Sequence, residues 1–163
     1  MSGPVIRLSD YLPEIKAAVK QAALQWMEET AGELEAQTKR ATTSDTGQTK
    51  NSWKHDVDAD AMEAVVGSDL ENAIWEEYGT GEFAAEGNGR KGAWYVPVES
   101  VTGSKKPTYN GQVVIVYGRG GQAFYKTNGK QPKKMLHGAW DHVIPKAKKA
   151  LAAKIKAVKN NHP

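Results

Sequence analysis

The feature that most limits what this 163-residue chain can fold into is a helical repeat of apolar residues near its N-terminus. Apolar side chains recur every three or four positions from Leu12 to Leu34, which places them on one face of a helix. Asp10 can cap this helix, and Pro13 fits its first turn. The spacing predicts a helix from about Tyr11 to Arg40, roughly 45 Å long at about 1.5 Å per residue. Such a long helix needs other elements of the fold to cover its apolar face.

The next part of the chain has the pattern of short elements separated by turns. Two alternating runs, 53–57 and 62–66, flank the acidic turn 58–60 and predict a β-hairpin. Residues 69–78 then predict a short helix that stops at Gly79, because glycine readily takes the left-handed conformation that ends helices. This order places a hairpin and a short helix beside the long N-terminal helix.

The short helix has two faces of different character. Ala73, Ile74 and Tyr78 share one face, and we expect Ile74 and Tyr78 to lock the helix onto a sheet. Glu76 and Glu77 do not share that face. We therefore expect both carboxylates to be exposed, as acidic groups for a basic partner.

The second half of the chain predicts further strands and two loops. Residues 93–98 and 112–118 predict strands, and Pro97 suggests that the first lies at a sheet edge or contains a bulge. Residues 79–92 and 118–134 are rich in glycine or basic side chains and lack an apolar period. We expect both of these segments to be flexible loops. The glycines of residues 79–92, beginning with Gly81, should leave that loop free to reach a neighbouring subunit.

A second long helix is predicted from about Lys134 to Lys159. Its apolar stripe includes Trp140, and Pro145 should kink or restart it. The fold class predicted from these elements is α+β: a small antiparallel sheet of about four strands, a long N-terminal helix, a short central helix and a long C-terminal helix. The length suggests one domain over residues 1–163.

The net charge of +3 conceals an asymmetry. Residues 126–163 contain ten lysines and one acid, a net +9, whereas residues 1–125 contain 12 basic and 18 acidic side chains, a net −6. Such a chain can pair head to tail with a neighbouring copy or contact nucleic acid. The simpler interpretation of the lysines is a solvated helix face.

Composition excludes several classes of protein. The chain has no cysteine, which rules out disulfide scaffolds, thiolate zinc sites and cysteine nucleophiles. Its apolar runs are far shorter than the roughly 20 residues that a membrane span needs. The first residues lack the pattern of a secretory signal, so we expect the protein to be made in the cytoplasm and to have no membrane partner.

Some segments match part of a ligand-binding motif but lack the flanking elements or residues that the motif requires. Residues 87–92 fit a dinucleotide-binding glycine pattern, but a loop precedes them and a strand follows. Asp56, Asp58 and Asp60 imitate a calcium loop, but Ala61 and Gly67 stand where glycine and glutamate are required. No histidine pair has zinc-binding helical spacing. We therefore expect no cofactor, no metal and no enzymatic activity.

One basic patch contains aromatic residues. Residues 123–126, "AFYK", could stack nucleic-acid bases beside neighbouring cations, which are Arg119, Lys130, Lys133 and Lys134. The alternative, which we prefer, is that Phe124 and Tyr125 anchor a loop to the core. A nucleic-acid-binding module that uses the basic C-terminal region is thus the second functional hypothesis.

Several short motifs occur in an order that is typical of one protein family. They are Thr46-Gly47 with Asn51-Ser52, Val66-Gly67-Ser68, Glu77-Tyr78-Gly79-Thr80, and "GKQPKKML" before the final helix. In this order, from about residue 10 to 158, the chain resembles the small tail-completion or head–tail joining proteins of long-tailed phages and prophages. Thr49 departs from the pattern, where an apolar residue is usual, and residues 99–111 and 118–131 are longer than it requires.

The resemblance implies a structural virion protein. Such proteins assemble as a ring, by the resemblance a hexamer, at the head–tail junction, first in the host cytoplasm and then in the virion. The implied partners are other copies of the chain, connector or stopper proteins, and the tail tube or tail terminator protein, with weak DNA contact in the channel. The residues expected at these interfaces are Glu76, Glu77, Gly79, Thr80, Gly81, Arg90, Lys91, Arg119, Lys126, Lys130, Lys133 and Lys134.

Overall fold

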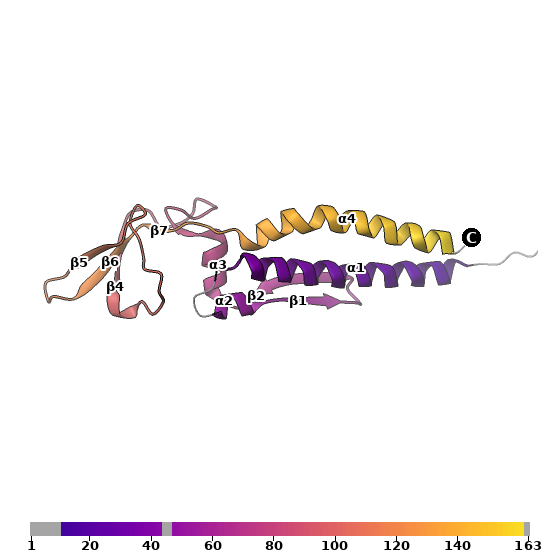
Figure 1. Cartoon of the computed structure of the whole chain (residues 1–163), viewed down its shortest axis with the longest axis horizontal. Coiled ribbons are helices and arrows are strands. Elements are labelled where there is room, and N and C mark those ends of the chain that lie inside the picture. The colour runs from indigo at the N-terminus through magenta and orange to yellow at the C-terminus, as the bar shows by residue number, and fades with distance from the viewer. Residues whose placement is uncertain (1–10, 44–46, 162–163) are drawn as a thin grey trace, which may run out of the picture.

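The computed structural model describes residues 11–43 and 47–161, and it is elongated (Figure 1). The expected helix cap Asp10 and the motif residue Thr46 lie outside the described residues. One part, here called the helical body, contains two long helices with a hairpin and two short helices. The other part, here called the distal sheet, lies at one end of the molecule and consists of three strands (Figure 1).

The two long helices form the axis of the helical body. Helix α1 spans Leu12–Ala41, as the apolar repeat predicted. Helix α4 spans Met135–Asn161, begins beside the end of α1 and runs back along it (Figure 1). Leu34 of α1 packs with Ala139 and Val143 of α4 in one core cluster. Helix α4 continues through Pro145, so this proline does not divide it.

A hairpin packs against α1 and confirms the alternating pattern. After the short helix α2 (Gln48–Ser52), strand β1 (Trp53–Asp58) pairs antiparallel with β2 (Glu63–Ser68). The Asp58 carboxylate accepts hydrogen bonds from the backbone N–H groups of Asp60 and Ala61, each at 2.8 Å, and thereby shapes the turn. Residues 58–63 are called the hairpin tip below.

Helix α3 spans Glu71–Tyr78, but it does not use the face that we predicted. Ala73 is fully buried and packs with Trp53 and Met135 in a second core cluster. Ile74 and Tyr78 are 55% and 41% exposed, so the expectation that they lock the helix onto a sheet was wrong. The small side chain of Ala73 lets α3 approach the core closely, and this orientation turns the bulky apolar residues outward.

The distal sheet contains a strand that the sequence analysis missed. Strands β4 (Trp94–Pro97) and β5 (Val114–Tyr117) confirm two predicted runs, but both pair with β6 (Ala123–Thr127), which lies between them. Strand β6 lies in the segment 118–134, where we expected only a loop. A single 3-10 turn, Val98–Ser100, follows β4.

Two very short strands connect the distal sheet to the helical body. Strand β3 (Thr80–Gly81) pairs antiparallel with β7 (Gly129–Lys130). The described residues thus contain seven strands in three small sheets, where we expected one sheet of about four strands. The fold class is α+β with three principal helices, as predicted.

The aromatic residues show how the two parts are packed. Tyr125 of β6 is 6% exposed, which supports the prediction that this aromatic segment is anchored by packing. Trp26 is half-buried, and its indole N–H donates to the carbonyl of Ala147 at 2.7 Å, which ties α1 to α4. Trp140 was expected in the buried stripe of α4, but it is 54% exposed.

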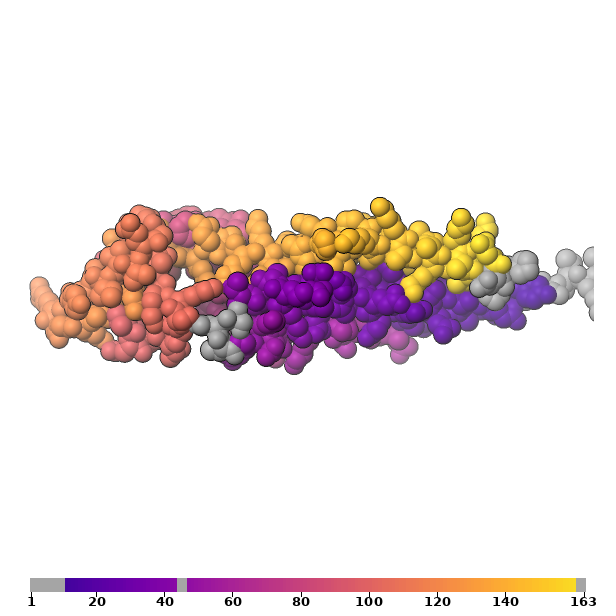
Figure 2. All heavy atoms as spheres, viewed as in Figure 1, coloured from indigo at the N-terminus to yellow at the C-terminus, as the bar shows by residue number. Residues whose placement is uncertain are grey.

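Figure 2 shows α1 and α4 packed against each other along the helical body, with the distal sheet projecting beyond their shared end. Within residues 11–43 and 47–161, no helix has the length and apolarity required to cross a membrane.

Candidate interaction site at the base of the distal sheet

The chain passes between the helical body and the distal sheet twice, and both passages lie at one place. The first passage leaves α3 through β3, and the second returns through β7 to α4. This junction brings together six of the residues that the sequence analysis proposed, which are Glu76, Gly79, Thr80, Gly81, Lys130 and Lys133.

Glu76 is a buried acid held by two lysines. Its side chain is 10% exposed, and the ammonium groups of Lys130 and Lys133 contact its carboxylate oxygens. Its backbone carbonyl accepts a hydrogen bond from the backbone N–H of Lys133 at 2.8 Å. Burying a carboxylate is costly unless cations accompany it, and the segment leading into α4 supplies two. The expectation that Glu76 is exposed was therefore wrong.

Glu77 is also buried, at 3% exposure, and it performs a different task. Its carboxylate accepts hydrogen bonds from the backbone N–H groups of Leu136 and His137 at 2.8 and 3.0 Å. It also contacts the Nδ1 atom of His137 at 2.6 Å. These are unpaired N–H groups in the first turn of α4, where a negative charge is also favoured by the helix dipole. Glu77 thus caps α4 from α3, and the prediction of an exposed acid was wrong.

The lysines at the junction are crowded. Burial lowers the pKa of Lys130 below its ordinary value, and the charge of Lys133 lowers it further. Burial also lowers the pKa of Lys133. The ammonium groups of Lys133 and Lys105 both donate to the hydroxyl of Thr43, at 2.7 and 3.3 Å. An anionic group nearby would stabilise this concentration of positive charge.

The glycines at the junction allow close backbone contact. Gly79 and Gly81 have φ of 72° and 62°, which favours glycine. A Cβ atom on Gly81 would lie 2.4 Å from the Asn128 carbonyl oxygen, and one on Gly79 would lie 2.7 Å from that of Lys130. Gly129 is tighter still, with the Thr80 carbonyl oxygen only 2.0 Å from such an atom. The expectation that Gly81 frees a loop was wrong, because this glycine packs two chain passages together.

A buried amide that the sequence analysis missed joins three segments. Asn128 is 2% exposed, and its side-chain N–H groups donate to the Glu82 carboxylate at 2.9 Å and the Asn110 side-chain oxygen at 3.0 Å. Its own side-chain oxygen accepts from the backbone N–H of Asn110 at 3.3 Å. A lone asparagine between threonine and glycine gives no sequence signal for this role.

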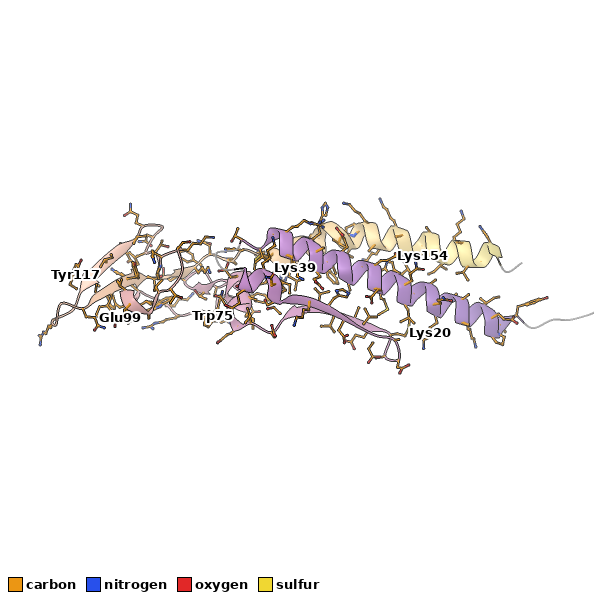
Figure 3. The ribbon with its side chains drawn as sticks, turned by 60° about the horizontal axis from the view of Figure 1, so that its bottom comes forward. Lys20, Lys39, Trp75, Glu99, Tyr117 and Lys154 are labelled. Atoms are coloured by element: carbon orange, nitrogen blue, oxygen red, sulfur yellow. The ribbon has the colours of Figure 1, made fainter. Side chains whose placement is uncertain are left out.

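A groove of about 670 Å³ runs along the junction between α3 and the distal sheet. Trp75, which is 46% exposed, and Trp94 contribute aromatic walls, and Figure 3 shows Trp75 where the two parts meet. Four lysines also line this space, which we call the basic groove: Lys105, Lys106, Lys130 and Lys133. The sequence analysis missed Trp75, Trp94, Lys105 and Lys106, although the paired lysines before Pro107 were a visible signal.

The remaining predicted interface residues do not form a single cluster. The Arg90 guanidinium lies 5.4 Å from the ring centre of Trp94, and the Lys126 ammonium lies 4.0 Å from that of Tyr109, both suited to cation–π attraction. Lys91, Arg119 and Lys134 are exposed. Arg119 lies in the turn between β5 and β6, away from the junction, so the structure does not gather the predicted set into one site.

The chemistry of the basic groove suits recognition. Its aromatic walls can contact an apolar side chain, and its lysines can pair with carboxylates or phosphates. Across the described ranges 11–43 and 47–161, no group of histidine, aspartate and glutamate side chains is arranged to hold a metal ion. The arrangement therefore favours binding of an anionic partner that also carries an apolar group.

The comparison with family models found that the N-terminal part of the chain is similar to a family of phage proteins. The HK97-gp10-like model, described as "Bacteriophage HK97-gp10, putative tail-component", matches residues 6–79. The match confirms the resemblance to a phage tail and head–tail joining family, and it includes α1, α2, the hairpin and α3. The search of curated proteins and the search of solved structures each found no match.

Proposed function

We propose that this chain is a structural protein of a tailed-phage particle. It assembles as a closed ring, a hexamer by its resemblance, at the head–tail junction, where it completes the tail and joins it to the head. The family match over residues 6–79 is the observation that carries this proposal. The chain performs no catalytic step in this role, and it moves from the host cytoplasm into the virion during assembly.

The shape and charge of the molecule support ring assembly. A closed ring is built from two different surfaces that contact each other around a rotation axis. Two surfaces of opposite charge support this proposal, since the hairpin tip carries Asp58, Asp60 and Glu63, whereas the basic groove carries lysines. An elongated subunit also has two ends, which can contact connector or stopper proteins on one side and the tail tube or terminator on the other (Figure 1).

The proposal is tested in the phage or prophage that encodes the chain. A stop codon at Trp75 truncates the protein before the junction, and electron microscopy of the lysate should show separate DNA-filled heads and tails. Tails of abnormal length would indicate a role in ending tail growth, and tails of normal length a role in joining. Suppression of the stop codon by a tryptophan-inserting tRNA is the control, and it should restore complete particles. Infectious particles without suppression would refute the proposal.

A second function, nucleic-acid binding, has one observation in its favour. Helix α4 exposes five lysines to solvent, which are Lys146, Lys148, Lys149, Lys156 and Lys159. Binding through such side chains weakens steeply with salt, because phosphate contacts release counterions. Fluorescence anisotropy with duplex DNA would favour this function if the dissociation constant were micromolar or tighter near 150 mM salt. Weaker binding would leave DNA as a minor contact within the channel.

A further inference from the structure

The hairpin tip is an exposed projection with acidic and apolar groups side by side. The hydrogen bonds from Asp60 and Ala61 to the Asp58 carboxylate fix its shape. They also hold the pKa of Asp58 below its ordinary value, so the carboxylate stays ionised. Met62 is 39% exposed and has a φ of 55°, a conformation that a residue with a side chain rarely adopts. The fold thus tolerates local strain while it presents a methionine between acids.

The basic groove has the complementary chemistry. Methionine makes favourable contacts with aromatic rings, and Trp75 and Trp94 offer such rings in the groove. Lys105 and Lys106 are exposed beside them, and their ammonium groups donate to neutral oxygens, the Thr43 hydroxyl at 3.3 Å and the Gly103 carbonyl at 2.8 Å. Glu76 already neutralises part of the charge of Lys130 and Lys133. The acids of the hairpin tip are therefore suited to Lys105 and Lys106.

The hairpin tip cannot reach the basic groove of its own chain. Strand β1 starts beside α2 and runs away from the distal sheet, so the tip points toward the opposite end of the molecule (Figure 1). The groove lies between α3 and the distal sheet. Figure 3, turned by 60°, shows the same separation, with oxygen-tipped side chains at the free end of the hairpin. Any contact between these two features must join two copies of the chain.

We infer that the hairpin tip of one copy inserts into the basic groove of the next copy, and that Met62 enters between the tryptophans while Asp60 and Glu63 pair with Lys105 and Lys106. This inference rests on the proposed function, for which it supplies the contact between subunits. The contact joins two different surfaces, so it can continue from copy to copy around a ring. The preformed turn also limits the conformational entropy that binding costs.

Cysteine cross-linking tests the contact directly, because the natural chain contains no cysteine. Ala61→Cys in one protein and Thr108→Cys in another place single thiols on the hairpin tip and in the groove. Mixing the two under mild oxidation should give a disulfide-linked heterodimer, since a disulfide requires Cα atoms within about 7 Å. One protein that carries both cysteines should give a ladder of linked copies. Lys148→Cys on α4 replaces Thr108→Cys in the matched control, which should give no ladder.

Charge reversal tests the chemistry of the same contact. Asp60→Lys with Glu63→Lys on the tip should weaken self-association by about 30-fold or more, as should Lys105→Glu with Lys106→Glu in the groove. The protein with all four changes should recover to within about fivefold of the natural chain, because the charges are again opposite. The control, Lys148→Glu with Lys149→Glu, changes net charge equally and should have less than about a threefold effect. Sedimentation velocity measures each.

The outcomes separate this inference from the proposed function. An oligomer that forms no cross-link and is insensitive to these reversals would overturn the hairpin contact and leave the ring. A protein that stays monomeric would overturn self-association through this contact, and the stop-codon experiment would still decide the role in joining. Recovery of assembly in the fourfold variant, together with the cross-linked ladder, would establish the contact.

Discussion

The helical body and the distal sheet are stabilised in different ways. The helical body buries apolar side chains in two clusters that join helices far apart in the sequence, around Leu34 and around Trp53. In the distal sheet Tyr125 is buried, but Ile115 and Tyr117 are 44% and 75% exposed. Apolar burial is the main favourable term in folding, so we expect the body to be the more stable part and the distal sheet to depend on its polar junction.

The largest effect is expected from the core of the helical body. Trp53 is 3% exposed, and Trp53→Ala should lower the free energy of unfolding by about 3–5 kcal/mol. Urea denaturation followed by circular dichroism measures this change, because most of the helix lies in the body. Trp75→Ala is the matched control, and it should cost less than about 1 kcal/mol because the side chain is 46% exposed. Equal costs would contradict the contrast between core and groove.

The next effect concerns the cap that joins α3 to α4. Glu77→Ala leaves the N–H groups of Leu136 and His137 without their acceptor and should cost about 2–3 kcal/mol. Thermal unfolding monitored by circular dichroism would show it. Glu71→Ala removes an exposed glutamate from the same helix and should change stability by less than about 0.5 kcal/mol. A cost as small for Glu77 would show that the cap does not hold α4.

A smaller and local effect should separate the distal sheet from the body. Gly129→Ala forces a Cβ atom against the Thr80 carbonyl oxygen at a φ of 124°, which should cost about 1–3 kcal/mol at the junction. Limited proteolysis should then cut residues 82–128 sooner while the body resists. Gly67→Ala, where no atom lies within 4 Å, should leave the digestion pattern unchanged. Simultaneous loss of both parts in Gly129→Ala would mean that they unfold together.

The smallest effect is a pH dependence within the body. Hydrogen bonds from Lys39 and then His55 lower the pKa of Glu35 from 4.5 to about 2, and its carboxylate lies 2.5 Å from the His55 Nδ1 atom. The same bond raises the pKa of His55 above 6.5, with Glu28 contributing further at 3.3 Å from its Nε2 atom. The pair lies near the surface, so its contribution should be below about 1 kcal/mol.

The sign of this dependence follows from the two shifts. The stability from Glu35 is present above pH 4.5 and is lost as the pH falls toward about 2. The stability from His55 is present below pH 6.5 and is lost as the pH rises through its raised pKa. The melting temperature of His55→Gln should therefore fall furthest below that of the natural chain between pH 4.5 and 6.5. A difference that is constant with pH would mean that His55 acts only through packing.

The elements with long or regular patterns could be predicted from the sequence. The apolar repeat specified α1, and strict alternation on both sides of an acidic turn specified the hairpin. Strand β6 could not be identified, because its five residues include Lys126 and Thr127, follow a glycine-rich segment and precede a basic one. Its place in the sheet is determined by pairing with β4 and β5, which is information from outside the segment.

The acids of the candidate site show why local patterns fail in short helices. Helix α3 has about two turns, and its apolar side chains are compatible with more than one buried face. Ala73 decides the face, and the groups that make burial of Glu76 and Glu77 tolerable are supplied more than fifty positions later in the chain. The periodicity of residues 69–78 contains no trace of those partners, so the glutamates were predicted to be exposed.

The pairing of β3 with β7 means that the distal sheet is an insertion whose two ends lie side by side. Thr80 and Lys130 are register partners, so everything between them leaves and re-enters the rest of the chain at neighbouring points. The family match stops at residue 79, immediately before this point. Another small domain with closely spaced ends could be grafted there while α1, α3 and α4 remain in place. An evolving lineage could in the same way exchange the specificity of one end without redesigning the rest.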